Sequence, residues 1–489
     1  MKKLFKIYII LIIMLTSCEG FLDEFPPQQI TSGNFYQTEE EMIMASNSVF
    51  EQLYTVWGQG ALPYLYGDLY GGDSYVLFTV GTASDWEDIG NHMEVYPANG
   101  VVTGSWNNYY RSIFRVNDFL AELEEFGDNF DTPGLGTRMK AEALFVRSCF
   151  YYYLTECFGD VPLVLEVLGP EEAKGYVQED EAVIDAQIES DLTYAVENLP
   201  PSYSSAETGR VTSWAAKGML ARVYMSNGKN TQAQVLLQDI ISNGPFTLDS
   251  NGDGQINNQD YSYMFDAYTK NSPESLLELQ FIHGVGGKNQ TYAQQFCPRV
   301  MGWHYPGQTQ TIEPWGLGAV PDELYDAFEP DDTVRRSISA DMYYDDLATG
   351  DPLYCPTTTK FYHGYLETFN NGSNVPIIRY SEILLNMSEV TGDPQYLNMV
   401  RARAGLPGFG EAGYPAEFTT LDEALEHERR VEFSFEFQRG FDLKRTGRFI
   451  TVKSQDLGKQ LEEWRIYFPI PQAILDINKK MHQNTGYLQ

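Results

Sequence analysis

The segment from Ser213 to Pro245 constrains the fold more than any other, because it has the pattern of two short helices packed against each other. Small side chains at Ala221 and Ala233 let two helices approach closely, and Tyr224 can fill the groove beside them. Apolar residues complete the shared face at Leu220, Leu237 and Ile240. The sequence therefore predicts a helical hairpin here.

These offsets are those of a tetratricopeptide repeat, a unit that is stable only when it stacks on neighbouring units. We therefore predict a mainly α fold with a tetratricopeptide-like helical scaffold and long ligand-binding loops. The aromatic stripe from Phe145 to Tyr153 is interpreted as core. Further helices are predicted from apolar residues at helical spacing over 37–55, 105–126, 138–158, 177–198, 376–403 and 419–441.

Charged residues recur at three- and four-residue steps in the segment 419–445. On a helix such pairs contribute only about 0.2–0.5 kcal/mol each, so we assign them a structural role. The residues concerned are Glu432, Glu436, Arg439, Asp442 and Arg445.

Two long stretches, residues 57–100 and 283–320, lack a helical period and are rich in glycine and aromatic residues. Loops longer than about 12–15 residues are uncommon in compact domains unless they are functional. Tyrosine and tryptophan offer large rigid faces with a polar tip, which suits binding of a ligand that has both apolar and hydroxyl-bearing surfaces. The candidate ligand-binding residues are Trp57, Tyr75 and Trp86 in the first stretch and Trp303, His304, Tyr305 and Trp315 in the second.

The first residues form an export signal. Three lysines precede a nine-residue apolar run from Ile7 to Leu15. A spanning helix needs about 20 apolar residues, so this run predicts a signal peptide that is removed. Small residues then lead to Cys18, as in the signal of a lipoprotein, and we expect a lipid on Cys18 to anchor the chain to a membrane. The expected divisions are a signal peptide over 1–17, a lipid-proximal spacer over 18–35 and one helical domain over 36–489.

The charge balance excludes one class of partner. The chain has 33 Lys and Arg against 68 Asp and Glu, a net charge of −35, and loss of the signal peptide removes three lysines more. Binding to nucleic acid depends on cationic side chains that displace counterions from phosphates. We therefore expect no nucleic-acid partner.

The sequence predicts a calcium loop from Asp249 to Asp260. The pattern is D-x-N-x-D-G, with Gly254 at the sharp turn and an acid at position twelve. Position twelve is usually Glu, and the shorter Asp at this position departs from that pattern. The predicted ligands of a structural Ca²⁺ are Asp249, Asn251, Asp253, Gln255 and Asp260.

Motifs of common enzymes are missing from the sequence. It has no Gly-x-Ser-x-Gly elbow, no His-Glu-x-x-His zinc helix and no glycine-rich phosphate loop. A secreted glycoside hydrolase that uses two carboxylates is the alternative from an enzyme class. A purely structural surface protein without a ligand is a third possibility.

Strings spread over the whole chain resemble one family. Near the start, Ser17-Cys18 is followed by Phe21-Leu22-Asp23. The middle of the chain contains Trp106-Asn107-Asn108-Tyr109-Tyr110 and Phe158-Gly159-Asp160-Val161-Pro162-Leu163. The last third contains Arg379-Tyr380-Ser381-Glu382, Phe441-Asp442-Leu443 and Pro469-Ile470-Pro471-Gln472. Together they resemble the SusD/RagB-like nutrient-uptake lipoproteins of the Bacteroidetes outer membrane.

The resemblance implies a non-enzymatic protein on the cell surface, anchored to the outer membrane by its lipid. Members of that family capture glycans, or in some branches peptides, and cap a SusC-like TonB-dependent transporter. Both kinds of ligand are compatible with a site that has acids among aromatic residues. The sequence does not separate glycan capture from peptide capture.

Overall fold

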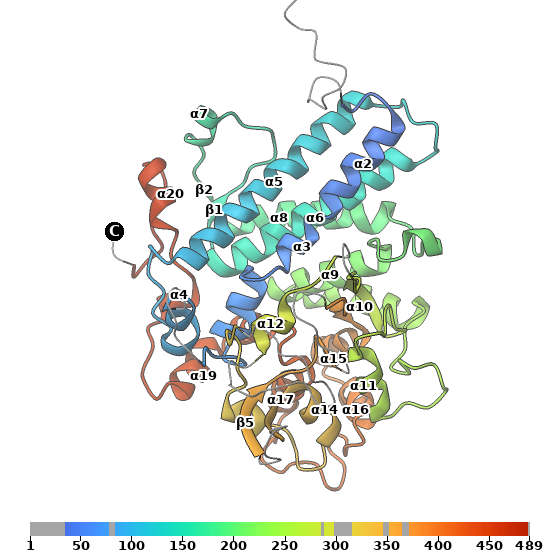
Figure 1. Ribbon diagram of the computed structural model, residues 1–489, viewed down its shortest axis with the longest axis vertical. Coiled ribbons are helices and arrows are strands. Elements are labelled where there is room, and N and C mark those ends of the chain that lie inside the picture. Colours follow the sequence, from blue (N-terminus) through green and yellow to red (C-terminus); the bar gives the residue numbers. More distant parts are fainter. Residues whose placement is uncertain are drawn as a thin grey trace, which may run out of the picture.

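The computed structural model describes residues 35–77, 84–284, 288–297, 315–345, 352–363 and 371–487. In these residues the chain is mainly helical, as predicted (Figure 1). The elements up to residue 265 are α2 (Glu39–Phe50), α3 (Leu53–Val56), the π-helical turn η1 (Pro63–Tyr70), α4 (Ser84–Glu87), the π-helical turn η3 (Asp88–His92), α5 (Gly100–Phe126), α6 (Leu135–Phe158), β1 (Val161–Pro162), α7 (Pro170–Ala173), β2 (Gln178–Glu179), α8 (Glu181–Asn198), the 3-10 turn η4 (Ser205–Glu207), α9 (Ser213–Ser226), α10 (Asn230–Asn243) and α11 (Asn258–Phe265).

The second half of the chain has shorter helices and most of the strands. Its elements are β3 (Ser275–Leu279), α12 (Tyr292–Phe296), α13 (Asp322–Tyr325), α14 (Thr333–Ser339), β4 (Asp341–Asp345), β5 (Pro352–Thr357), β6 (Val375–Arg379), α15 (Tyr380–Thr391), α16 (Pro394–Arg403), α17 (Leu421–Phe433), α18 (Arg439–Arg445), α19 (Phe449–Asp456), the 3-10 turn η5 (Glu463–Ile466) and α20 (Gln472–Ile477). The strands pair antiparallel as β1–β2, β3–β6 and β4–β5. No helix in the described part of the chain has both the length and the hydropathy that crossing a bilayer requires.

The predicted helical hairpin is confirmed as α9 and α10. The Thr212 side chain accepts a hydrogen bond from the Ala215 N–H and so caps the start of α9. Ala221 and Ala233 are fully buried where the two helices meet. Helix α8 packs against α9, and α10 packs against α15, so the hairpin is one unit of a larger helical stack (Figure 1). This arrangement confirms the tetratricopeptide-like scaffold.

The long helices α5 and α6 also confirm the sequence prediction, and α6 supplies much of the core. The Asn99 side chain caps α5 by accepting hydrogen bonds from the N–H groups of Val101 and Val102. The aromatic residues between Phe145 and Tyr153 are at most 3% exposed. The aromatic stripe is therefore core, as predicted.

The stretch 57–100 was predicted as a long loop, but its described residues, 57–77 and 84–100, are partly helical and in large part buried. Every residue of η1 is buried. The hydroxyl groups of Tyr66 and Tyr70 donate to the carbonyl oxygens of Ile466 and Arg465, at 2.6 and 2.7 Å. The prediction was wrong because these aromatic side chains fill the core from a π-helical turn, which has no 3.6-residue period.

The predicted helix 419–441 is broken after Phe433, and α18 begins at Arg439. Phe435 and Phe437 between them have φ angles of 61° and 67°, which side-chain-bearing residues rarely adopt. The Phe437 N–H donates to both carboxylate oxygens of Asp68, at 3.1 and 3.2 Å. A Cβ atom on Gly67 would lie 2.3 Å from the Phe437 carbonyl oxygen. Contact with η1 therefore imposes the break.

The predicted helix 376–403 is also divided. Its first residues form β6, and α15 and α16 follow with Gly392 between them at φ 69°. Glycine adopts this angle without strain, which allows the chain to reverse direction there.

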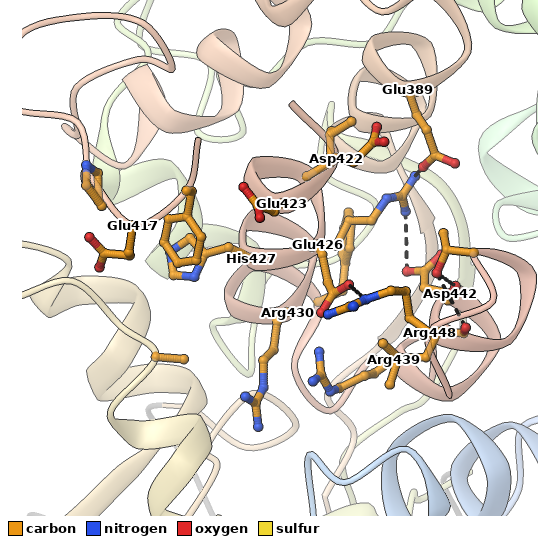
Figure 2. Close-up of a pocket in the computed structure, with 18 of the residues that line it drawn as sticks. Glu389, Glu417, Asp422, Glu423, Glu426, His427, Arg430, Arg439, Asp442 and Arg448 are labelled. Carbon is orange, nitrogen blue, oxygen red and sulfur yellow. Dashed lines mark hydrogen bonds and ion pairs between the residues drawn. The ribbon is translucent and has the colours of Figure 1, made fainter. Parts of the chain in front are cut away.

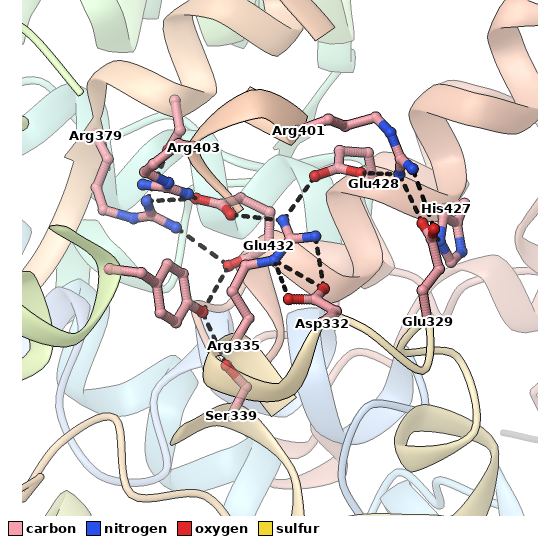
Figure 3. A network of polar contacts seen from close by, with 12 residues as sticks. Glu329, Asp332, Arg335, Ser339, Arg379, Arg401, Arg403, His427, Glu428 and Glu432 are labelled. Carbon is pink, nitrogen blue, oxygen red and sulfur yellow. Dashed lines mark hydrogen bonds and ion pairs between the residues drawn. The ribbon is translucent and has the colours of Figure 1, made fainter. Parts of the chain in front are cut away.

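A buried network of ion pairs connects α17 to its neighbours (Figure 3). Glu432 is fully buried and lies 3.0 Å from Arg335 and 2.8 Å from Arg379. It also pairs with Arg403. The structural role predicted for Glu432 is confirmed, but its partners come from other elements and not from the same helix. Figure 3 also shows Arg335 and Arg401 paired with Glu428, and Arg401 paired with Glu329.

Candidate functional site

A cavity of about 1500 Å³ opens beside α17 and α18 (Figure 2). The connection from α13 to α14 and the loop between α16 and α17 complete its lining. The buried ion pairs of α17 fix the helix that carries many of the lining side chains. The cavity is thus built on a rigid part of the scaffold.

The lining of the cavity is rich in charged side chains. Arg430 and Arg439 lie together at the lower side in Figure 2, near α18. Carboxylates occupy much of the remaining surface, at Glu323, Asp326, Glu417, Asp422 and Glu423. Three more arginines line the cavity, and each is paired with a carboxylate: Arg429, Arg445 and Arg448. We call the part that Arg430 and Arg439 line the cationic end of the cavity.

Asp73, from the first of the two aromatic-rich stretches, lies against this cationic end. Its Oδ1 is 3.1 Å from Arg430 Nε and 3.3 Å from Arg439 Nε. Asp73 is fully buried. Burial, together with the charge of Asp73, raises the pKa of the neighbouring Asp68 carboxyl well above its ordinary value.

The chain that follows Asp73 joins the two aromatic-rich stretches. The N–H of Tyr75 donates to the Ala319 carbonyl oxygen at 3.0 Å, and the Ala319 N–H donates back at 2.8 Å. The N–H of Trp315 donates to the Gln294 carbonyl oxygen at 2.8 Å, which ties this residue to α12. Both Tyr75 and Trp315 are partly exposed. The fold therefore brings these two predicted residues into one region.

Tyr75 is surrounded by polar groups. Its side chain is hydrogen-bonded to Tyr354 of β5, which is 43% exposed, and lies near Asp322 and Glu323 of α13. Burial, with Tyr354 and these two carboxylates, raises the pKa of Tyr75. Glu323 also lines the cavity. Helix α13 thus connects the aromatic region to the cavity.

The other candidate aromatic residues divide into three groups. Trp86 in α4 is partly exposed and lies beside Tyr64, with 6.1 Å between ring centroids. Trp57 is a core residue, 2% exposed, and donates from Nε1 to the Tyr153 hydroxyl at 3.2 Å. We correct its assignment, because a buried indole has no face for a ligand. Trp303, His304, Tyr305 and the lipidation residue Cys18 lie outside the described residues.

The predicted calcium loop has the turn that such a loop needs. Asp249 and Asn251 both accept from the Asp253 N–H, at 3.1 and 2.9 Å. Gly254, at φ 84°, allows the sharp turn, and its N–H donates to Asp249 at 2.9 Å. Gln255, whose carbonyl is a predicted ligand, follows directly.

The closing acid of the loop is held by the protein itself. Asp260 is fully buried and accepts from the N–H groups of Asn251 and Asn257. No three His, Cys, Asp or Glu side chains of the described residues converge as metal ligands. The donor set is present but not converged, and calcium binding stays a prediction.

Sequence reasoning missed the Arg430–Arg439–Asp73 group. Arg439 falls in the charged segment that was assigned a structural role, and Arg430 follows Arg429 on α17. The partner carboxylate, Asp73, comes from the other end of the chain. Only the fold brings the three side chains together.

Two family models match the chain. One, described as "SusD family", matches residues 184–487, and the other, described as "Starch-binding associating with outer membrane", matches residues 20–225. SusD-like protein P25 of Formosa agariphila is 25% identical, over 98% of this chain and 98% of its own. A SusD-like protein of Bacteroides ovatus is 24% identical, over 96% of this chain and 86% of its own.

Solved structures show the same fold. A laminarin-binding SusD-like protein superposes with a TM-score of 0.75 at 26% identity, over 92% of this chain and 100% of that chain. Surface glycan-binding protein A of Bacteroides thetaiotaomicron superposes with a TM-score of 0.74 at 21% identity, over 92% of this chain and 100% of that chain.

Proposed function

The chain belongs to the SusD family, and from this premise we propose that it is a surface-exposed lipoprotein of the outer membrane that captures a glycan. The proposed anchor is a lipid on Cys18. The proposed partner is a SusC-like TonB-dependent transporter, to which the glycan is delivered. The description of the second family model, which associates its members with the outer membrane, supports this location.

The bridge between Tyr75 and Ala319 is the observation that carries the glycan proposal. Together with the hydrogen bond from the Leu77 N–H to the Gly316 carbonyl oxygen at 3.3 Å, it brings the chain at Tyr75 close to the chain at Trp315. Both residues are partly exposed, and Tyr75 lies near the carboxylates of Asp322 and Glu323. Rings of this kind can pack against the C–H faces of a sugar while carboxylates accept hydrogen bonds from its hydroxyl groups. The likeness to a laminarin-binding protein supports the same class of ligand.

We propose no catalytic step for this site. The family and the glycan-binding relatives favour capture without bond cleavage. A hydrolase would need two carboxyl groups on opposite sides of a glycosidic bond, with one of them protonated as the general acid. The carboxylates that line the cavity can bind sugar hydroxyl groups without either role.

A binding screen tests the proposal. Soluble protein that begins at Glu19 is passed over immobilised glycans and peptides, and the release of reducing ends is measured in parallel. Retention on a glycan without new reducing ends supports the proposed function. Retention on peptides alone favours the peptide-capturing alternative, and new reducing ends indicate a hydrolase. Copurification of a TonB-dependent transporter from detergent-solubilised membranes tests the proposed partner.

A further inference from the structure

Arg430 and Arg439 use few of their hydrogen-bond donors within the described part of the protein. A guanidinium group has five N–H donors. Arg439 is only 7% exposed, yet in the described part of the chain it donates no hydrogen bond. Arg430 donates from Nε to Asp73, its one hydrogen bond among the described residues. Both side chains line the cavity (Figure 2).

By contrast, one fully buried arginine of the ion-pair network is well supplied with acceptors. Arg379 donates to Glu274, Glu432 and Glu436. A hydrogen bond to a charged group typically contributes about 1.5–3 kcal/mol. A cationic pair with free donors at the wall of a cavity is therefore a place where a ligand oxygen would be bound with a gain in free energy.

The charge at this end of the cavity is also incompletely balanced. Two guanidinium groups share one oxygen of Asp73. The nearby acids are already paired, Glu426 with Arg448 at 3.0 Å and Asp456 with Lys453 at 3.1 Å. Burial, and next the charge of Arg430, lower the pKa of Arg439 in spite of these acids. The two guanidinium groups therefore face only the single negative charge of Asp73.

We infer that Arg430 and Arg439 form a subsite for an oxyanion, a carboxylate or sulfate group, carried by the ligand that enters the cavity. Planar guanidinium groups bind such anions with two parallel N–H donors, and bonds of this kind are stronger than those between neutral groups. If the ligand is the glycan of the proposed function, it is then an acidic one, with a uronic acid or a sulfate ester. Only the identity of the molecule that carries the oxyanion rests on the proposed function.

The subsite can be tested with small probes before any glycan is known. Sodium glucuronate, sodium sulfate and neutral glucose are titrated calorimetrically into the soluble protein at constant ionic strength. The wild type is compared with Arg439→Gln and with Arg430→Gln. The matched control is Arg448→Gln, which removes a cavity-lining arginine that is half exposed and already paired with Glu426.

Glucuronate and sulfate are expected to bind both the wild type and Arg448→Gln. The affinity for glucose is expected to be the same in the wild type and in the Arg430 and Arg439 variants. Each substitution at Arg430 or Arg439 is expected to weaken oxyanion binding by about tenfold or more, because it removes charge-assisted hydrogen bonds. Equal binding by wild type and both variants, or no oxyanion binding to the wild type, would overturn the inference. If Arg439→Gln does not fold, as judged by circular dichroism, Arg430→Gln gives the same test, since Asp73 then keeps Arg439.

The result of this titration can be distinguished from the result of the glycan-binding screen. Binding of a neutral glycan without any oxyanion effect would contradict the subsite and leave glycan capture standing. Oxyanion binding that depends on Arg430 and Arg439, without retention on any glycan, would support the subsite and contradict glycan capture.

Discussion

Tyr75 and Ala319 exchange two backbone hydrogen bonds, of 3.0 and 2.8 Å, although they lie in stretches far apart in the sequence. This bridge joins the described parts of the two segments that carry Tyr75 and Trp315. Asp73, two residues before Tyr75, contacts Arg430 and Arg439 at the cavity. The first stretch therefore links the aromatic region with the cationic end of the cavity.

Substitution of Gly67 by alanine is expected to destabilise the protein. The new Cβ would lie 2.3 Å from the Phe437 carbonyl oxygen, so the backbone of η1 or of the segment before α18 has to move. Overpacking of this kind typically costs about 1–3 kcal/mol, and more when the contact is with backbone. Urea denaturation of the soluble protein measures the change in free energy of unfolding.

The matched control is Gly104→Ala within α5. Nothing lies within 4 Å of the position of its Cβ. Alanine favours the helix interior by up to about 1 kcal/mol relative to glycine, so this variant should be as stable as the wild type or more so. Equal stability of the two variants would contradict the close packing of η1 against Phe437.

Acid pH is expected to destabilise the protein partly through Glu329. Although burial opposes ionisation, a hydrogen bond from Arg401 and the positive charges of Arg401 and of His427, whose Nε2 is 3.6 Å away, lower the pKa of Glu329 to about 2. An unfolded Glu has a pKa of about 4.3. Because the folded value is the lower one, the stabilisation is present above about pH 4.3 and is lost as the pH falls towards 2.

The Glu329→Gln variant should therefore lose less of its unfolding free energy than the wild type between about pH 5 and pH 2.5. Urea denaturation at several pH values measures, for each protein, the slope of the unfolding free energy against pH. Glu417→Gln is the control, since it removes an exposed carboxylate that lines the same cavity. Identical slopes for Glu329→Gln and wild type would show that this carboxylate is not held ionised by its partners.

Calcium is expected to stabilise the loop from Asp249 to Asp260. A ligand that binds only the folded state stabilises it by about 2.7 kcal/mol at 100 times its dissociation constant. Adding Ca²⁺ to chelator-treated protein should raise the melting temperature of the wild type but not of Asp249→Asn. A melting temperature that does not respond to Ca²⁺ in the wild type would remove the metal site and leave a turn held by Asx hydrogen bonds.

Sequence patterns predicted the scaffold well where one helix face is apolar over several turns. Helices α5 and α6 and the hairpin of α9 and α10 were found in this way. The pattern failed for η1, whose residues are buried on all sides, and for Phe435 and Phe437, whose positive φ angles depend on Asp68 and Gly67. Contacts between distant segments decided both cases.

The candidate site was predictable only in part. Aromatic composition selected Tyr75 and Trp315, whose role in ligand binding stays a prediction, and it also selected Trp57, which the fold places in the core. The arginine pair could not be found, because Arg439 resembles any helical charge until Asp73 is placed beside it. Residue type indicates possible chemistry, and burial decides whether a ligand can reach it.

The most direct test of glycan capture by the joined stretches is the affinity of Trp315→Ala and Trp303→Ala for a glycan that the wild type retains. Tyr263→Ala is the control, because Tyr263 is an exposed aromatic residue on α11 outside these stretches. Isothermal titration calorimetry should show weaker binding for Trp315→Ala or Trp303→Ala, by about 1 kcal/mol or more for a lost aromatic contact, and unchanged binding for the control. Unchanged affinity in both tryptophan variants would contradict the proposed site.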